Sequence, residues 1–373
     1  MNVLITGGAG FIGSHTADAL LEAGHAVRVL DSLEEPVHRG KKVPGYLDSR
    51  IDFVQGDVRD EATLLRCLRG VDAVYHLAAF QDYLPTFSRF FDVNVTSTAL
   101  IYELIVREKL PVKKVIVASS QSTLGEGRYR DATGKDVFPG LRSNEQLERG
   151  IWEIQAGPGQ EGPLSYQRTD ETVANPQNTY GMSKIAEERV ALNLGRQYGV
   201  PSVAMRYSIV QGPRQSFYNA YSGACRVFCL SFQLGRDPVI YEDGQQVRDF
   251  VNIADVVDAN LLVLRDERAD YQMFNVGGDK AITVAEFAQA AAEVFEKKDY
   301  RAVPSGKYRY GDTRHIFSDV SKLKALGWAP RRNIKESVAA YRTWLSGAGA
   351  AEEILDYSNR VMASLGVVRE VKA

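Results

Sequence analysis

The stretch Val3-Leu4-Ile5-Thr6-Gly7-Gly8-Ala9-Gly10-Phe11-Ile12-Gly13 decides the fold of this chain. Its first four residues predict a short buried strand, and the pattern over 12–23 predicts an amphipathic helix directly after the glycines. The spacing fits G-x-G-x-x-G at Gly8, Gly10 and Gly13, and also G-x-x-G-x-x-G from Gly7. Glycines at these places allow a tight turn, a close approach to a pyrophosphate and close packing of helix on strand. The stretch therefore predicts a dinucleotide-binding turn at a helix N-terminus.

The type of dinucleotide follows from Asp31, which ends the second predicted strand at about 20 residues after the turn. A carboxylate at this place accepts hydrogen bonds from the adenosine ribose and repels a 2′-phosphate. Arg28 lies inside the strand pattern, where it is poorly placed to bind a phosphate. The sequence therefore predicts NAD rather than NADP.

The rest of the first half alternates short apolar runs with amphipathic stretches. Alternation of this kind is typical of a parallel sheet covered by helices on both faces. We expect an α/β fold, a Rossmann-type doubly wound parallel sheet, over residues 1–207. The predicted strands are 3–6, 26–30, 51–55, 73–77, 115–118 and 202–206, and the clearest further helices are 91–108 and 183–198. Residues 126–170, rich in Gly, Gln, Glu and Arg, read as a long functional insertion or lid.

After residue 207 the pattern changes to a smaller α+β domain, expected over 208–345, with some segments returning to the first domain. Its predicted strands are 239–241, 249–252 and 273–276, and its predicted helices are 255–264, 284–295 and 334–345. Two of these helices begin with capping boxes, Thr283 with Glu286 and Asn333 with Glu336. Residues 346–373 are expected to form a helical tail.

Composition excludes several classes of protein. The 45 Lys and Arg nearly balance the 47 Asp and Glu, so nothing favours nucleic acid or an anionic membrane as a partner. No apolar run approaches the roughly 20 residues of a membrane span, and the N-terminus shows no leader, so a cytoplasmic protein is expected. Cys225 and Cys229 lie four apart on a predicted helix without further ligands nearby, which favours core packing and no metal.

Tyr180 and Lys184 are the candidate catalytic residues, since a spacing of four puts both on one helix face. A neighbouring ammonium stabilises the phenolate and lowers the tyrosine pKa. Moving this pKa from about 10 toward 7 requires roughly 4 kcal/mol, which Lys184 and a positive nicotinamide could supply in a dry site.

At this point the chain resembles a family, the extended short-chain dehydrogenase/reductases, and within it the nucleotide-sugar epimerases and dehydratases. The resemblance covers Met1 to about Leu345. It rests on the glycine turn, Asp31, Gly56-Asp57-Val58, His76-Leu77-Ala78-Ala79, Ser119-Ser120 and Tyr180-Gly181-Met182-Ser183-Lys184, in family order. In such proteins Ser120, Tyr180 and Lys184 would form the catalytic triad. His76 we interpret as a core histidine.

The resemblance also implies the cofactor and substrate residues. NAD would contact Gly7, Gly10, Phe11, Ile12, Gly13, Asp31, Asp57, Val58, Leu77, Ala78, Ala79, Ser119, Tyr180, Lys184 and Tyr207. A nucleoside-diphosphate sugar would contact Ser120, Gln121, Ser122, Tyr180, Arg248, Arg309 and Asp312. The two arginines suit a diphosphate because a guanidinium makes paired contacts to phosphate oxygens.

The residues after Ser120 favour one reaction of the family. Dehydratases carry an Asp-Glu pair here, whereas this chain has Gln121 and Ser122. The remaining groups suit a 4-epimerase, in which Tyr180 takes the 4-hydroxyl proton while the C4 hydride passes to NAD⁺ and later returns to the other face. A 4,6-dehydratase and a non-catalytic dinucleotide-binding sensor are the alternatives.

The insertion narrows the resemblance further. Gly125-Glu126-Gly127-Arg128-Tyr129, Pro139-Gly140-Leu141-Arg142 and Glu145-Gln146-Leu147 are similar to the bacterial dTDP-L-rhamnose 4-epimerase group, which interconverts dTDP-L-rhamnose and dTDP-6-deoxy-L-talose. The family also pairs helices such as 91–108 and 183–198 across a two-fold axis, which predicts a homodimer.

Overall fold

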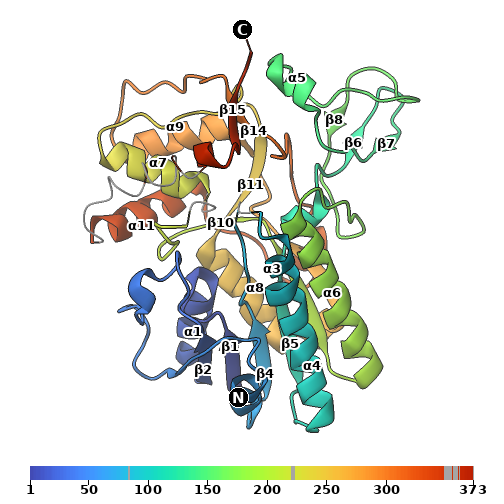
Figure 1. The fold of residues 1–373 in the computed structure, drawn as a ribbon, viewed down its shortest axis with the longest axis vertical. Coiled ribbons are helices and arrows are strands. Elements are labelled where there is room, and N and C mark those ends of the chain that lie inside the picture. Colours follow the sequence, from blue (N-terminus) through green and yellow to red (C-terminus); the bar gives the residue numbers. More distant parts are fainter. Residues whose placement is uncertain (83–84, 220–222, 348–354, 356–359, 361, 373) are drawn as a thin grey trace.

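Seven parallel strands form the central sheet of the protein, in the order β12-β9-β5-β4-β1-β2-β3 (Figure 1). The computed structural model describes residues 1–373 except 83–84, 220–222, 348–354, 356–359, 361 and 373. The strands are β1 (Asn2–Thr6), β2 (Ala26–Asp31), β3 (Asp52–Gln55), β4 (Ala73–His76), β5 (Lys114–Ser120), β9 (Ser202–Tyr207) and β12 (Gln272–Val276). The predicted doubly wound parallel sheet is confirmed, and the six strands predicted in the first half are all present, with ends shifted by at most two residues.

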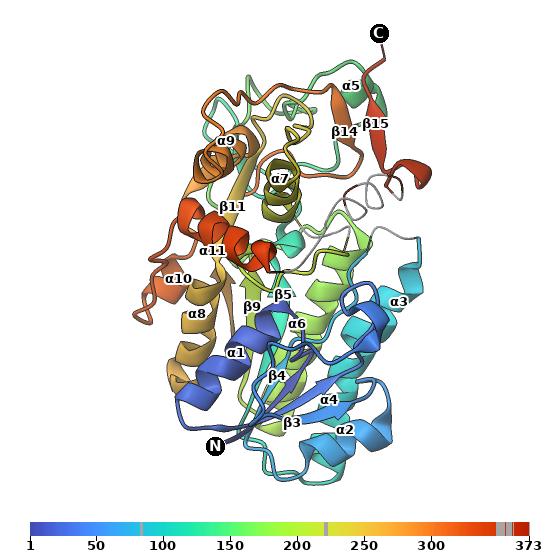
Figure 2. The same cartoon turned by 90° about the vertical axis from the view of Figure 1, so that its left-hand side faces the viewer.

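Helices cover both faces of this sheet. Alternate residues of β1 point to opposite sides: Val3 and Ile5 join one core cluster, and Leu4 joins the other. The first face carries α1 (Phe11–Glu22) and α8 (Ile253–Arg265), which lie side by side in Figure 2. The second face carries α2 (Glu61–Leu68), α4 (Ser97–Arg107) and α6 (Thr179–Tyr198).

The strand order reverses at β1, and this fixes where a ligand can enter. β1 pairs with β2 on one side and with β4 on the other, and all three run in the same direction. The connections from β1 to β2 and from β4 to β5 leave the sheet in opposite directions, which opens a crevice at the carboxyl ends of the strands. The glycine turn directly follows β1, so it lies at this crevice.

A smaller sheet belongs to the second half of the chain. β10 (Ile209–Gln211) pairs in parallel with β11 (Val247–Asn252), which pairs antiparallel with β13 (Ala281–Thr283). Its apolar cluster includes Cys225, Phe228, Phe250, Phe287 and Tyr341. The helices packed there are α7 (Ala224–Gln233), α9 (Val284–Val294) and α11 (Ile334–Ser346). Both predicted capping boxes are confirmed, at α9 and at α11.

The insertion has its own small structure. β6 (Tyr129–Arg130) pairs antiparallel with β7 (Asp136–Val137) and β8 (Ser165–Tyr166), and α5 (Asn144–Glu148) follows β7. The remaining short elements are α3 (Phe87–Phe91), η1 (Arg39–Lys41), η3 (Gln121–Leu124), η4 (Glu267–Ala269) and α10 (Ser321–Lys324).

The sequence was misleading in three places. The predicted strand 239–241 is reduced to a single bridge at Ile240, because the left-handed backbone of Glu242, at φ 53°, turns the chain away. The tail is not one helix: β15 (Val368–Glu370) pairs antiparallel with β14 (Lys307–Arg309), after Gly366 reverses the chain at φ 61°. The predicted helix 91–108 is interrupted by the π-helical turn η2 (Asp92–Thr96).

The π-helical turn has a clear structural reason. It buries Asn94, whose amide donates to the carbonyl of Phe80 at 3.1 Å and to Ser183 Oγ at 2.9 Å, and whose oxygen accepts from Phe80 N at 2.7 Å. One side chain thus ties the loop after β4 to helix α6. Irregular turns of this type are frequent at functional sites. No helix of the described part of the chain is both long and apolar enough to cross a membrane.

Breaking the buried ion pair between β9 and α6 should destabilise the fold. Arg206 and Glu188 are fully buried and joined by two hydrogen bonds, at 2.7 and 2.8 Å. Arg206→Leu would leave the carboxylate buried without its cation, so we expect a loss of about 3–5 kcal/mol in the free energy of unfolding, measured in urea. The control Arg50→Leu removes an exposed arginine that pairs with Asp48, and should leave the free energy of unfolding almost unchanged. Equal losses in both variants would contradict this account.

Candidate active site

A cavity of about 980 Å³ lies between the carboxyl edge of the large sheet and the second half of the chain. Of the residues predicted to bind NAD, all but Gly13 line it. The residues predicted to bind the substrate also line it: Ser120, Gln121, Ser122, Tyr180, Arg248, Arg309 and Asp312. One continuous space therefore brings together residues from both ends of the sequence.

The glycine turn fits a dinucleotide because no side chain could occupy it. Gly7 has a left-handed φ of 69°, and a Cβ there would lie 2.6 Å from the backbone nitrogen of Ala78. A Cβ on Gly13 would lie 2.4 Å from the carbonyl oxygen of Gly7, which explains why Gly13 packs inside the turn instead of lining the cavity. Helix α1 begins after Gly10 without a side-chain cap, so its first N–H groups can bind phosphate.

Asp31, predicted to bind the adenosine ribose, is held in place beside the glycine turn. Its carboxylate accepts hydrogen bonds from Ala9 N at 3.0 Å and from Leu33 N at 2.9 Å. Each oxygen retains a lone pair that a ribose hydroxyl could use. Arg28 points away, since it pairs with Asp52 and donates to the carbonyl of Cys67. The arrangement fits NAD. Arg28 is not placed to bind the 2′-phosphate of NADP.

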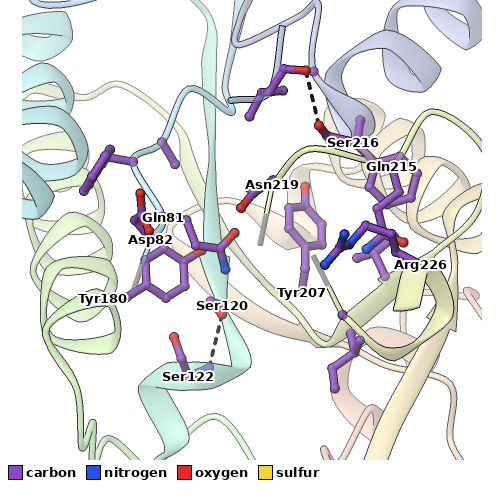
Figure 3. Close-up of a pocket in the computed structure, with 18 of the residues that line it drawn as sticks. Gln81, Asp82, Ser120, Ser122, Tyr180, Tyr207, Gln215, Ser216, Asn219 and Arg226 are labelled. Atoms are coloured by element: carbon purple, nitrogen blue, oxygen red, sulfur yellow. Dashed lines mark hydrogen bonds between the residues drawn. The ribbon is translucent and has the colours of Figure 1, made fainter. Parts of the chain in front are cut away.

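The three candidate catalytic side chains meet at the end of β5. Helix α6 begins with Asn178 as its cap, which places Tyr180 in the first turn and Lys184 in the second. The Lys184 ammonium lies 5.9 Å from the centre of the Tyr180 ring and donates to the carbonyl of Ala118 at 2.7 Å. Ser120 accepts a hydrogen bond from Ser122 N at 3.2 Å (Figure 3). A hydroxyl, a phenol and an ammonium therefore face one reaction space.

The pKa of Tyr180 is raised, whereas the position of Lys184 in the sequence led us to expect a lowered pKa. Burial raises the pKa of Tyr180, Lys184 lowers it, Glu187 raises it, and a hydrogen bond with Ser120 lowers it, with a net increase. The protein residues alone therefore do not bring the pKa of Tyr180 toward 7. The reason is that the phenol is removed from water more completely than one ammonium can compensate.

A second charged group in the cavity consists of Arg248, Arg309 and Asp312. Asp312 Oδ2 lies 3.1 Å from an Arg309 nitrogen and 3.7 Å from an Arg248 nitrogen. Burial raises the pKa of Asp312, but the two arginines and Arg142 outweigh this, so the carboxyl group is held ionised. Two guanidinium groups at one place suit a diphosphate.

The insertion fixes this charged group in position. Arg142 is buried and binds both oxygens of Glu242, at 2.8 and 2.9 Å, and it donates to the carbonyl of Asp312 at 2.9 Å. Arg314 also binds Glu242, at 3.0 Å. The insertion is thus joined to the second half of the chain by buried charges, next to residues predicted to bind the substrate.

Several residues that line the cavity were missed from the sequence. Figure 3 shows Gln81 beside Tyr180 and Ser120, and Arg226 with Gln215 on the opposite side. Arg226 is fully buried and donates to the carbonyl of Phe217 at 2.9 Å. The available signal was a lone charged residue within the mostly apolar helix α7.

The tail also reaches the cavity. Leu355 and Met362, both buried, line it, although the sequence assigned no role to this segment. The pairing of β15 with β14 explains how the tail is held there, because β14 carries Arg309. No sequence pattern indicated this contact, since it depends on the tertiary fold.

Two interpretations of isolated residues agree with the structure. His76 is a core histidine between Thr6 Oγ1, at 2.7 Å, and Ser97 Oγ, at 3.0 Å, and burial with the nearby Lys184 lowers its pKa to about 3. Cys225 and Cys229 are buried free thiols with sulfurs 3.9 Å apart. Within the described ranges, no group of three or more His, Cys, Asp and Glu side chains could hold a metal ion.

Comparisons with known proteins identify the family. The NAD dependent epimerase/dehydratase family matches residues 3–143 and 154–277. A dTDP-L-rhamnose 4-epimerase of Burkholderia thailandensis is 31% identical over 350 residues, covering 92% of this chain and 94% of that protein.

Solved structures agree with this result. A UDP-glucose 4-epimerase of Thermotoga maritima with UDP-glucose has a TM-score of 0.74 and 29% identity, covering 93% of this chain and 99% of that one. A UDP-glucose 4-epimerase of Thermus thermophilus in complex with NAD has a TM-score of 0.73 and 26% identity, covering 94% of this chain and all of that one (100%). The protein is an NAD-dependent enzyme of the short-chain dehydrogenase/reductase type, and it belongs to the NAD dependent epimerase/dehydratase family.

Proposed function

We propose that this enzyme is a nucleoside-diphosphate-sugar 4-epimerase, with dTDP-L-rhamnose and dTDP-6-deoxy-L-talose as its first candidate substrate pair. One observation carries the proposal. Ser120, Tyr180 and Lys184 meet in the cavity, and the two residues after Ser120 are Gln121 and Ser122, which cannot act as the acid and base of a dehydration. The identity of the sugar is supported by the similarity to the Burkholderia enzyme.

The reaction requires the protein to move one proton and to hold the sugar O4 in position. NAD bound along the glycine turn supplies the acceptor for the C4 hydride and its return. Ser120 donates a hydrogen bond to the sugar O4, and Tyr180 removes the proton from O4 and later restores it. Lys184 stabilises the phenolate form of Tyr180 by its charge.

The 4-keto sugar has to rotate between the two hydride transfers. The cavity has groups that could hold the nucleoside diphosphate during this rotation. Arg248 and Arg309 would bind the diphosphate, and Leu355 with Met362 would close the apolar side of the nucleotide site. The sugar ring would then be free to present either face while the nucleotide stays bound.

Assembly into a homodimer is also part of the proposal. Helices α4 and α6 pack together on one face of the large sheet. Each helix carries an exposed apolar side chain, Val106 on α4 and Met182 on α6. A helix pair of this kind at the edge of the molecule suits an isologous contact with a second copy of the chain.

Removing one hydroxyl group should separate catalysis from cofactor binding. Tyr180→Phe should lower the rate of 4-epimer interconversion at least about 1000-fold, because the base is lost, and the NAD content should not change. The measurement is mass spectrometry and NMR of products from dTDP-, UDP-, GDP- and CDP-sugars, with no cofactor added. Tyr198→Phe, an exposed tyrosine of the same helix, is the control.

Three outcomes of this experiment would contradict the proposal. Full activity of Tyr180→Phe would exclude Tyr180 as the base. Accumulation of a 4-keto-6-deoxy sugar would favour a 4,6-dehydratase, for which Asp82 of the cavity would be the first acid to test. Bound NAD without turnover of any sugar would favour a dinucleotide sensor.

Removing one arginine should affect the sugar nucleotide and not the dinucleotide. Arg309→Met should raise the KM for the sugar nucleotide about 10- to 100-fold, the loss expected for one or two charged hydrogen bonds to phosphate. The NAD content should stay unchanged, because Arg309 lies on β14 and not at the glycine turn that follows β1. Arg66→Met, an exposed arginine of α2, is the matched control. An unchanged KM would contradict the assignment of Arg309.

A further inference from the structure

Glu187 is a buried carboxylate beside the candidate catalytic residues. It lies one turn after Lys184 on α6 and is fully buried. Its Oε2 accepts a hydrogen bond from the Lys184 ammonium at 2.7 Å. Its Oε1 is also buried and has no hydrogen-bond partner among the residues that the structure describes.

This placement is energetically costly and needs a compensating interaction. A buried carboxylate is destabilising unless it is paired and hydrogen-bonded. The adjacent Glu188 is fully occupied elsewhere, since it binds Arg206 through both oxygens and accepts a hydrogen bond from Ser119. Glu187 therefore has Lys184 as its cationic partner, and a glutamine of the same shape would avoid the cost of the charge.

Lys184 needs such a partner as much as Glu187 does. The ammonium is only 1% exposed, and burial alone favours its neutral form. Burial lowers the pKa of Lys184, but the charge and hydrogen bond of Glu187, together with Tyr180 and Glu188, raise it above the usual value. Glu187 is the largest of these compensating influences.

Among the residues that the structure describes, the other ionisable groups packed around the pair are neutral or are bound elsewhere. From β4, His76 is neutral, because its pKa is lowered to about 3. From α4, Tyr102 is neutral, because burial raises its pKa. From β9, the charge of Arg206 is balanced by Glu188. Glu187 is therefore the carboxylate that binds the Lys184 ammonium directly.

We propose that Glu187 is the internal counterion of Lys184: it holds the ammonium between the Ala118 carbonyl and Tyr180, and keeps it protonated in its buried position. Glu187 is a positioning residue, since it acts through Lys184. The inference rests on the proposed function for its consequence in catalysis, but the state of Lys184 can be measured without any sugar substrate.

The range of pH over which the pair exists follows from its groups. Burial raises the pKa of Glu187 to about 7, with Lys184 lowering it. A carboxyl group with a raised pKa ionises only as the pH rises through that value, so the ion pair is half formed near pH 7 and becomes complete at higher pH. In that range Glu187 should delay the loss of the Lys184 proton, and should extend activity to higher pH.

The direct test titrates Lys184 in the NAD-containing protein by NMR of lysine labelled with ¹³C at Cε. The resonance is assigned by its absence in Lys184→Arg. In Glu187→Gln we expect the titration midpoint of Lys184 to fall by about one pH unit or more, because the counterion is lost and burial remains. Glu293→Gln, which removes an exposed carboxylate of α9, should leave the midpoint unchanged.

Activity provides a second measurement. If the protein is an epimerase, the alkaline limb of kcat/KM should move to lower pH in Glu187→Gln, and Glu187→Asp, which keeps the charge, should restore part of the difference. An unchanged Lys184 midpoint in Glu187→Gln would overturn the inference, whatever the activity. If Glu187→Gln does not fold, Glu187→Asp should show a smaller fall, and no fall would likewise overturn it. Absence of epimerase activity together with a shifted midpoint would contradict the proposed function and leave the role of Glu187 intact.

Discussion

In a parallel sheet every strand ends at the same edge, and in this protein that constraint places the reactive groups. The strands are buried on both faces, so polar side chains that need to reach a ligand are concentrated at and just beyond their carboxyl ends. Asp31 ends β2, Ser120 ends β5 and Tyr207 ends β9. The glycine turn follows β1 directly. Groups far apart in the chain therefore line one cavity, at the point where the strand order reverses.

A second constraint is that charged groups buried in and around this cavity have to be paired. Lys184 is paired with Glu187, Arg206 with Glu188, and Arg142 with Glu242. Each pair joins or supports elements that line the site: α6 to β9 in one case, and the insertion to the second half of the chain in another. The same pairs that offset the cost of burial thus fix the orientation of the groups proposed to bind and to react.

Local sequence patterns predicted much of the fold. The strands of the large sheet and the two capping boxes depend on neighbouring residues, and they were predicted to within a few residues. The predicted strand 239–241 failed because the conformation of Glu242 is set by contacts with residues far along the chain, including the carbonyl of Lys307. The tail failed for a similar reason, since β15 is a strand only because β14 lies beside it.

The candidate site shows the same division. Residues within motifs, such as Gly7, Asp31 and Tyr180, could be named from the sequence. Met362 could not, because no sequence pattern reveals that the tail will bring a side chain to a distant cavity. Arg226 and Glu187 left weaker signals, a lone arginine in a mostly apolar helix and a carboxylate three residues after Lys184. Burial also reversed the expected direction of the pKa of Tyr180, a quantity that no sequence pattern determines.

The central claim is that the C4 hydride is removed and returned at the same carbon. The most direct measurement uses dTDP-L-rhamnose carrying deuterium at C4, incubated in ordinary water without added cofactor and followed by NMR. The account predicts that the 4-epimer forms with the deuterium retained at C4. Deuterium lost to water, or accumulation of a 4-keto sugar without formation of the deuterated 4-epimer, would contradict the claim.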